Sequence, residues 1–136
     1  MDVSMILFLW ACQSESTHKT FNSPPEVLIV SHANETSFFE GETIDFAAQL
    51  SDGNHSNEEL QATWYMNDIE VCSASSPDSN GISHCSIVID LQATEISVRV
   101  VDTSQSADRD EISILVQENQ APIVNLISPQ SDQVYF

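Results

Sequence analysis

The sequence predicts an all-β fold, an antiparallel sandwich of about seven strands, and three observations support this prediction. Apolar and polar residues alternate along most segments with a period of two, which is the pattern of half-buried strands in two packed sheets. Clusters of Gly, Asn, Asp, Ser and Pro interrupt these segments in the way that turns do. No stretch of about 12 residues carries an apolar stripe at helical spacing.

The alternation places the individual strands and the residues that face inward. The expected strands are Val27–Val30, Thr43–Ser51, Ala62–Met66, Ile69–Cys72, Cys85–Leu91, Ile96–Val101 and Ile112–Gln117. The residues expected in the core are Ile44, Phe46, Ala48, Leu50, Ala62, Trp64, Met66, Cys85, Ile87, Ile89, Leu91, Ile96, Val98, Val100, Ile112, Ile114 and Val116. The main turns between the strands are Glu40–Glu42, Ser51–Asn54 and Ser76–Gly81. This arrangement predicts one hydrophobic core between two sheets.

The charge of the chain is strongly one-sided. Its 136 residues include 21 Asp and Glu against three Lys and Arg, which gives a formal net charge of −18. Such a chain repels phosphate backbones and has no basic cluster to release counterions, so we expect no nucleic-acid binding. Electrostatic attraction to anionic lipid is not expected either. The acidity favours solubility and attracts cations.

The first residues, 1–11, read as a signal peptide that is not part of the fold. The apolar run Met5–Ala11 is too short to cross a bilayer as a helix, which needs roughly 20 residues. The segment Leu9-Trp10-Ala11-Cys12 resembles the lipobox of bacterial lipoproteins, which implies cleavage before Cys12 and lipidation of its thiol. The polar stretch 12–21 reads as a flexible tether. We therefore expect an exported protein held to the membrane by a lipid; the alternative is a buried apolar segment with a free Cys12.

Two further cysteines, Cys72 and Cys85, remain once Cys12 carries lipid. Exported proteins meet an oxidising compartment, where an even pair is expected to form a disulfide. The alternative is a metal site made by Cys72, His84 and Cys85, although the spacing shows no Cys-x-x-Cys pair and no fourth ligand.

An internal repeat sets the domain boundary. Residues 22–39 align without a gap on residues 119–136, an offset of 97 positions. The identical pairs are Asn22/Asn119, Pro25/Pro122, Val27/Val124, Ser31/Ser128 and Phe39/Phe136. A period of this length is the size of an immunoglobulin-type sandwich. We therefore expect one domain over 22–118 and the first strand of a second, truncated repeat over 119–136; the alternative is that Ile123–Ile127 pairs as an extra edge strand of the first domain.

Several short motifs of this chain, taken in their order and spacing, resemble those of a known kind of repeat. They are a Pro-rich start, Phe39-Glu40-Gly41-Glu42-Thr43-Ile44, the lone Trp64 in the third strand and Val100-Val101-Asp102 before a loop. In this order they resemble bacterial immunoglobulin-like repeats, whose nearest relatives are polycystic-kidney-disease-type (PKD) and cadherin-like modules. The resemblance implies an immunoglobulin-like sandwich in a surface protein. Both cysteines follow the Trp, whereas those of antibody domains flank it, so we expect the bridge to join neighbouring strands.

No catalytic constellation is found in the sequence. The four histidines, His18, His32, His55 and His84, are scattered along the chain. There is no Gly-x-Ser-x-Gly elbow, no His-Glu-x-x-His and, with three glycines, no Gly-rich phosphate loop. We expect the chain not to be an enzyme.

Calcium is the one cofactor that the acidic loops suggest, because it takes six to eight oxygen ligands. Asp102, Asp108 and Asp110 lie in one expected loop, and Glu118 and Asn119 lie at the junction between repeats. That junction resembles the acidic linker of cadherin-like modules. These five residues are the candidate ligands; the alternative is a charged loop without metal.

The function expected from these features is that of a spacer or presentation module in a surface-anchored lipoprotein, exported to the cell envelope or cell surface. Its partners would be the membrane, through the lipid on Cys12, and neighbouring repeats. One alternative is an adhesive or carbohydrate-binding module with a protein or glycan ligand, stiffened by calcium; Phe38 and Phe39 could then form a sugar platform. Another is an accessory repeat of a larger secreted hydrolase.

Overall fold

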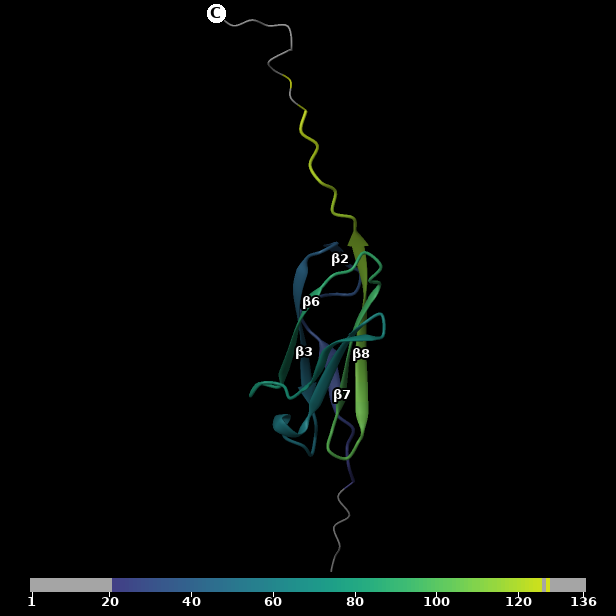
Figure 1. Ribbon diagram of the computed structural model, residues 1–136. Coiled ribbons are helices and arrows are strands. Elements are labelled where there is room, and N and C mark those ends of the chain that lie inside the picture. The colour runs from purple at the N-terminus through teal and green to yellow at the C-terminus, as the bar shows by residue number, and fades with distance from the viewer. Residues whose placement is uncertain (1–20, 126, 128–136) are drawn as a thin grey trace, which may run out of the picture.

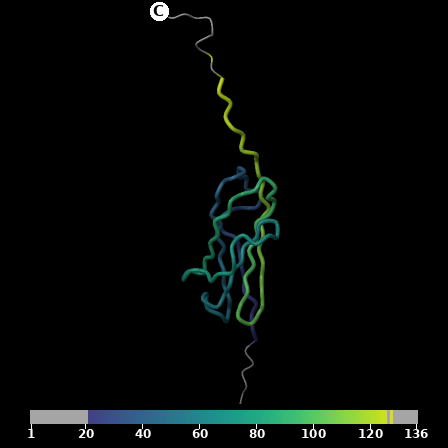
Figure 2. Tube along the Cα trace, in the orientation of Figure 1, coloured from purple at the N-terminus to yellow at the C-terminus, as the bar shows by residue number. Residues whose placement is uncertain are grey.

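The computed structural model describes residues 21–125 and residue 127 (Figures 1 and 2). The predicted signal peptide, the lipidation site at Cys12 and nearly all of the tether lie outside these residues. The described chain forms two sheets with one short 3-10 helix, η1 (Asn57–Glu59). No helix in that part of the chain is long and apolar enough to cross a bilayer.

The described residues form eight strands in two sheets, which confirms the all-β sandwich. The strands are β1 (Glu26–Ile29), β2 (Thr36–Phe39), β3 (Thr43–Ser51), β4 (Gln61–Met66), β5 (Ile69–Ser75), β6 (Ile82–Val88), β7 (Glu95–Val101) and β8 (Ala107–Gln117). One sheet has the order β1-β3-β6 and the other β2-β8-β7-β4-β5. Neighbouring strands are antiparallel except β2 and β8, which run parallel.

The core lies between the two sheets, where the alternate residues of facing strands meet. Phe46, Trp64 and Val98 are each at most 1% exposed. The rings of Phe46 on β3 and Trp64 on β4 lie 6.4 Å apart between centroids, so they join the two sheets. Trp64 Nε1 donates a hydrogen bond of 2.9 Å to Ser83 Oγ on β6. The indole is therefore fully buried without leaving its polar atom unpaired.

The period-two pattern predicted most strands but not all. Strand β3 begins and ends at the expected residues, whereas β6 lies three residues earlier than expected, and Leu91 is exposed in the loop after it. Strand β2, in which Phe38 is buried and Phe39 is exposed, was not predicted from the sequence. Because these two rings lie on opposite faces of the strand, they form no shared sugar platform.

A disulfide joins Cys72 to Cys85, with Cα atoms 6.1 Å apart, and confirms the predicted pair. The two cysteines lie on β5 and β6, which follow each other in the chain but belong to different sheets. The bridge thus joins two strands that are consecutive in the chain, as predicted. These strands are not paired in one sheet, however, so the expectation of neighbours within a sheet was wrong. The chain crosses between the sheets after β5, so the disulfide ties the two sheets together. Because both sulfurs are bonded, the alternative metal site with His84 has no thiolate ligands.

The chain enters and leaves the sandwich at opposite ends. Asn22 lies beside the β7–β8 loop, where its side chain donates to Asp102 and Ser106. At the other end of β8, Gln117 O accepts a hydrogen bond from Glu40 N. Figure 1 shows the N-terminal segment leaving one end of the sheets and the C-terminal segment leaving the other. Copies of such a domain can be joined end to end.

The residues after β8 lie in no strand as far as residue 125. Ile123, Val124 and Ile127 are largely exposed. The described part of the chain therefore gives no support to the alternative of an extra edge strand on the first domain. Residues 126 and 128–136 of the predicted second repeat lie outside the described residues.

Gly81, in the turn before β6, is expected to tolerate a side chain poorly. Its φ is +79°, and a Cβ there would lie 2.7 Å from Leu50 O. Gly41 is a matched control, because its φ is +81° but a Cβ there would have nothing within 4 Å. Both alanine variants carry the cost of a left-handed backbone, whereas only Gly81→Ala adds a clash with the backbone.

We therefore expect Gly81→Ala to lower the free energy of unfolding by about 1–3 kcal/mol more than Gly41→Ala does. Urea unfolding of the two variants measures the difference. Equal losses would show that the turn before β6 shifts to make room for the methyl group, contrary to this prediction.

Candidate functional site

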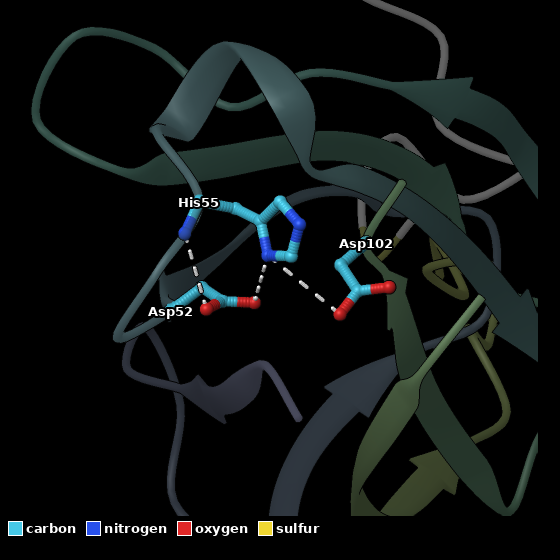
Figure 3. Close-up of side chains that lie close together, drawn as sticks. All are labelled: Asp52, His55 and Asp102. Carbon is cyan, nitrogen blue, oxygen red and sulfur yellow. Dashed lines mark hydrogen bonds and ion pairs between the residues drawn. The ribbon is translucent and has the colours of Figure 1, made fainter. Parts of the chain in front are cut away.

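Two loops bring an acid–histidine cluster together at the end where the chain enters the domain. Asp52 and His55 lie between β3 and η1, and Asp102 follows the last residue of β7. The sequence predicts a turn over Ser51–Asn54 and a metal ligand at Asp102, but it does not predict that the two lie together. Figure 3 shows the imidazole of His55 lying between the two carboxylates.

The three side chains meet at one nitrogen atom of the histidine. Nδ1 of His55 lies 3.1 Å from Oδ2 of Asp52 and 3.8 Å from Oδ2 of Asp102. The His55 side chain is 9% exposed, and both Asp side chains are 0% exposed. Among the described residues, His55 is the basic side chain that pairs with these carboxylates, while Arg109 pairs with acids elsewhere.

Backbone amides hold both carboxylates in place. Oδ1 of Asp52 accepts hydrogen bonds from the amides of Asn54, at 2.8 Å, and His55, at 3.3 Å, which is how an Asp at the start of a turn usually acts. Oδ1 of Asp102 accepts from the amide of Ser106 at 2.8 Å across the β7–β8 loop. In each case the second oxygen, Oδ2, lies on the side of His55.

Asn22 ties the incoming chain to both loops. Its Nδ2 donates to Oδ2 of Asp102 and to Oγ of Ser106, at 2.8 Å each. Its Oδ1 accepts from Nδ2 of Asn54 at 2.8 Å, and the amide of Ser23 donates to Oδ1 of Asn54 at 2.8 Å. The cluster therefore lies next to Asn22, the residue that anchors the incoming chain.

The pKa of the Asp102 carboxyl lies below its ordinary value. Burial raises this pKa, but hydrogen bonds from the Asn22 side chain and the Ser106 amide, together with the nearby His55 imidazole, lower it by more. A folded pKa below the unfolded one means that the ionised carboxylate stabilises the folded state above the unfolded pKa. That stabilisation is lost as the pH falls through the lower, folded pKa.

We therefore expect the free energy of unfolding to fall as the solution is acidified below about pH 4, with Asp102 as one source of the loss. In the Asp102→Asn variant this dependence should be shallower, because one ionisable partner is gone. Urea unfolding at a series of pH values measures both profiles. Glu118→Gln, which removes one exposed carboxylate beyond β8, is the control and should keep the original profile. An unchanged profile in Asp102→Asn would contradict the assignment.

The structure does not bring the five predicted calcium ligands together. Asp102 joins the cluster described above. Oδ2 of Asp108 accepts from the amide of Val27 at 3.0 Å, and Oδ2 of Asp110 accepts from the amide of Ile29 at 2.7 Å. These two carboxylates thus occupy the edge of β1 that faces β8, and they serve as partners for backbone amides.

The other two predicted ligands, Glu118 and Asn119, follow β8 at the end of the sandwich opposite to Asp102. The five residues therefore lie in three separate places, because β8 runs the length of the domain. Calcium binding at any one of these places stays a prediction.

Comparisons with known proteins place the fold but not the family. No family description and no curated protein matches the sequence. The fibronectin(III)-like modules of Clostridium thermocellum CbhA match with a TM-score of 0.57 and 14% identity, over 70% of this chain and 100% of that one. The I-band fragment I67–I69 from titin matches with a TM-score of 0.52 and 13% identity, over 71% of this chain and 33% of that one. At such identities the likeness shows the immunoglobulin-like fold alone.

Proposed function

We propose that this chain is a non-catalytic extracellular module that spaces or presents other parts of a lipid-anchored surface protein. The observation that carries the proposal is that the chain enters and leaves the sandwich at opposite ends, beside Asn22 and after Gln117. Modules linked in this way extend a chain by about the length of one domain per copy. A catalytic or ligand-enclosing domain has no need of this arrangement.

The internal repeat supports a tandem arrangement. Asn119 matches Asn22 in the alignment and follows Gln117, the last residue of β8, after the single residue Glu118. If Asn119 anchors a second domain as Asn22 anchors the first, one residue separates the two domains. A connection that short spans at most roughly 7 Å between the two anchored residues, so it restricts how the domains turn relative to each other. A restricted junction suits a spacer that must stand away from a surface.

The disulfide supports export. Bridges of this kind form and persist in oxidising compartments, and this one joins the two sheets across the core. The lipobox-like segment that ends at Cys12 supports anchoring, because it provides a cleavage site and a thiol for lipid. A polar tether over 12–21 then separates the membrane from the first domain.

Metabolic labelling with a fatty acid in a bacterial host tests the anchoring. We expect the full chain to take up the label, to fractionate with the membrane and to have a mature N-terminus at Cys12. Cys12→Ser should lose the label and the membrane association and still contain the Cys72–Cys85 disulfide. A mature protein that starts at another residue, or an unlabelled chain in the soluble fraction, would refute the lipid anchor.

A further inference from the structure

The nitrogen of His55 that faces the cluster has two competing neighbours. Nδ1 lies 3.1 Å from Oδ2 of Asp52, an acceptor, and 3.3 Å from Nδ2 of Asn54, a donor. One imidazole nitrogen cannot donate to the first and accept from the second at the same time. When Nδ1 carries no proton and its lone pair points into the cluster, that lone pair and the Oδ2 atoms of Asp52 and Asp102 surround one point. The His55 side chain is more than nine-tenths buried, so bulk water has little access to this point.

The charge of the cluster gives a second reason to expect a cation there. Two carboxylates with fully buried side chains face each other across one imidazole. Buried charges are normally paired with a cation or coordinate a metal. Within the described residues no Lys or Arg forms an ion pair with either carboxylate, since the ion pairs of Arg109 go to Asp68, Glu95 and Glu111. A cation between the three atoms would balance the charge and accept all three lone pairs.

We propose that Asp52, His55 and Asp102 bind one divalent transition-metal cation of the zinc class. Zinc takes imidazole nitrogen and carboxylate oxygen at about 2.0–2.2 Å, which puts the ligand atoms of a tetrahedral site roughly 3.3 Å apart. The distances from Nδ1 to the two oxygens, 3.1 and 3.8 Å, lie on either side of that value. One ligand atom from each of the three residues lies within 4.8 Å of the others. The fourth position is left for water.

The donor set separates this site from the calcium ligands predicted from the sequence. Calcium prefers six to eight oxygens, whereas the atom at the centre of this cluster is an imidazole nitrogen, a ligand that suits zinc, copper or nickel. The site stands apart from the proposed function and does not depend on it. Its consequence is local: Asn22 donates to the same oxygen of Asp102 that would bind the metal, so the metal would reinforce the end at which the chain is anchored.

A zinc titration of the full chain tests the proposal. The chain carries Cys12→Ser, so that no free thiol competes, keeps its disulfide and is first stripped with a chelator. We expect one zinc ion to bind and to shift the imidazole nitrogen resonances of His55 but not those of His32 and His84. Zinc at about a hundredfold excess over its Kd should raise the Tm by roughly 5 °C or more, because it binds the folded state. Calcium and magnesium at the same concentration should leave the His55 resonances unchanged.

Two variants locate the site. His55→Gln should abolish the zinc-dependent rise in Tm, whereas His84→Gln, which changes an exposed histidine on β6, should keep it. If His55→Gln fails to fold, the resonances of His55 in the parent chain decide the question. A titration in which those resonances do not respond, or a His55→Gln variant that zinc stabilises as much as its parent, would overturn the proposal and leave a proton as the occupant of the cluster.

Discussion

Replacing Trp64 with alanine is expected to lower the free energy of unfolding by about 3–5 kcal/mol, the largest loss that we predict for a single substitution here. The indole is 1% exposed, packs on Phe46 of the facing sheet and donates to Ser83. Its removal deletes much of the contact between the sheets and leaves a cavity that the β-framework cannot close. It also leaves the buried Ser83 hydroxyl without its donor.

Urea unfolding followed by far-UV circular dichroism measures this loss, since the variant lacks the fluorophore of the core. Leu28→Ala is the control, because it removes a leucine side chain that is exposed on β1 and should change stability by less than about 0.5 kcal/mol. A loss of under 1 kcal/mol in Trp64→Ala would mean that Trp64 does not hold the two sheets together.

Removing the disulfide should have the second largest effect. The cysteines are 13 positions apart, and closing a loop of that size contributes roughly 3 kcal/mol on the chain-entropy model. The positions of the two cysteines in the sheets add to this stabilisation. Cys72 on β5 is paired with Trp64 on β4, and Cys85 on β6 is paired with Phe46 on β3. The bridge and the aromatic pair thus connect the same two positions of the two sheets. Loss of the bridge should loosen the aromatic packing next to it.

The Cys72→Ala/Cys85→Ala double variant is expected to unfold at a lower urea concentration, with a loss of about 3 kcal/mol. The fluorescence of Trp64 should also shift towards that of a more exposed indole before the main transition. Cys12→Ser, which changes the cysteine that takes no part in this bridge, should match the parent. If the double variant is as stable as the parent, the bridge is not a structural tie.

The sequence predicted the elements that carry a long alternation. Strand β3 has four inward-facing apolar positions and β7 has three, and both were identified with bounds close to those observed. Strand β2 has four residues with one buried side chain, Phe38, too few to show a period. The pairing of Cys72 with Cys85 followed from their number, but the sheets that they join depend on where the chain crosses between layers, which alternation does not reveal.

The candidate site was predicted only in part, for a physical reason. Asp102 and the turn around Asp52 were both identified from residue type, but they are far apart in the sequence. Whether Asp102 and Asp52 come together depends on which loops lie at the same end of the sandwich. The order of the strands in the sheets determines which loops these are. His55 gave no signal by itself, because its role comes from the two carboxylates that the fold places beside it. The calcium ligands were grouped by closeness in sequence, and the length of β8 separates them.

Reading the coding sequence beyond the codon for Phe136 tests most directly the central claim, that this sandwich is one unit of an end-to-end array. We predict further copies at a spacing of about 97 residues, each beginning with the Asn that anchors the incoming chain and each followed by a Pro and an apolar strand. A stop codon immediately after Phe136 would contradict the claim, and residues 119–136 would then have to be explained within a single domain.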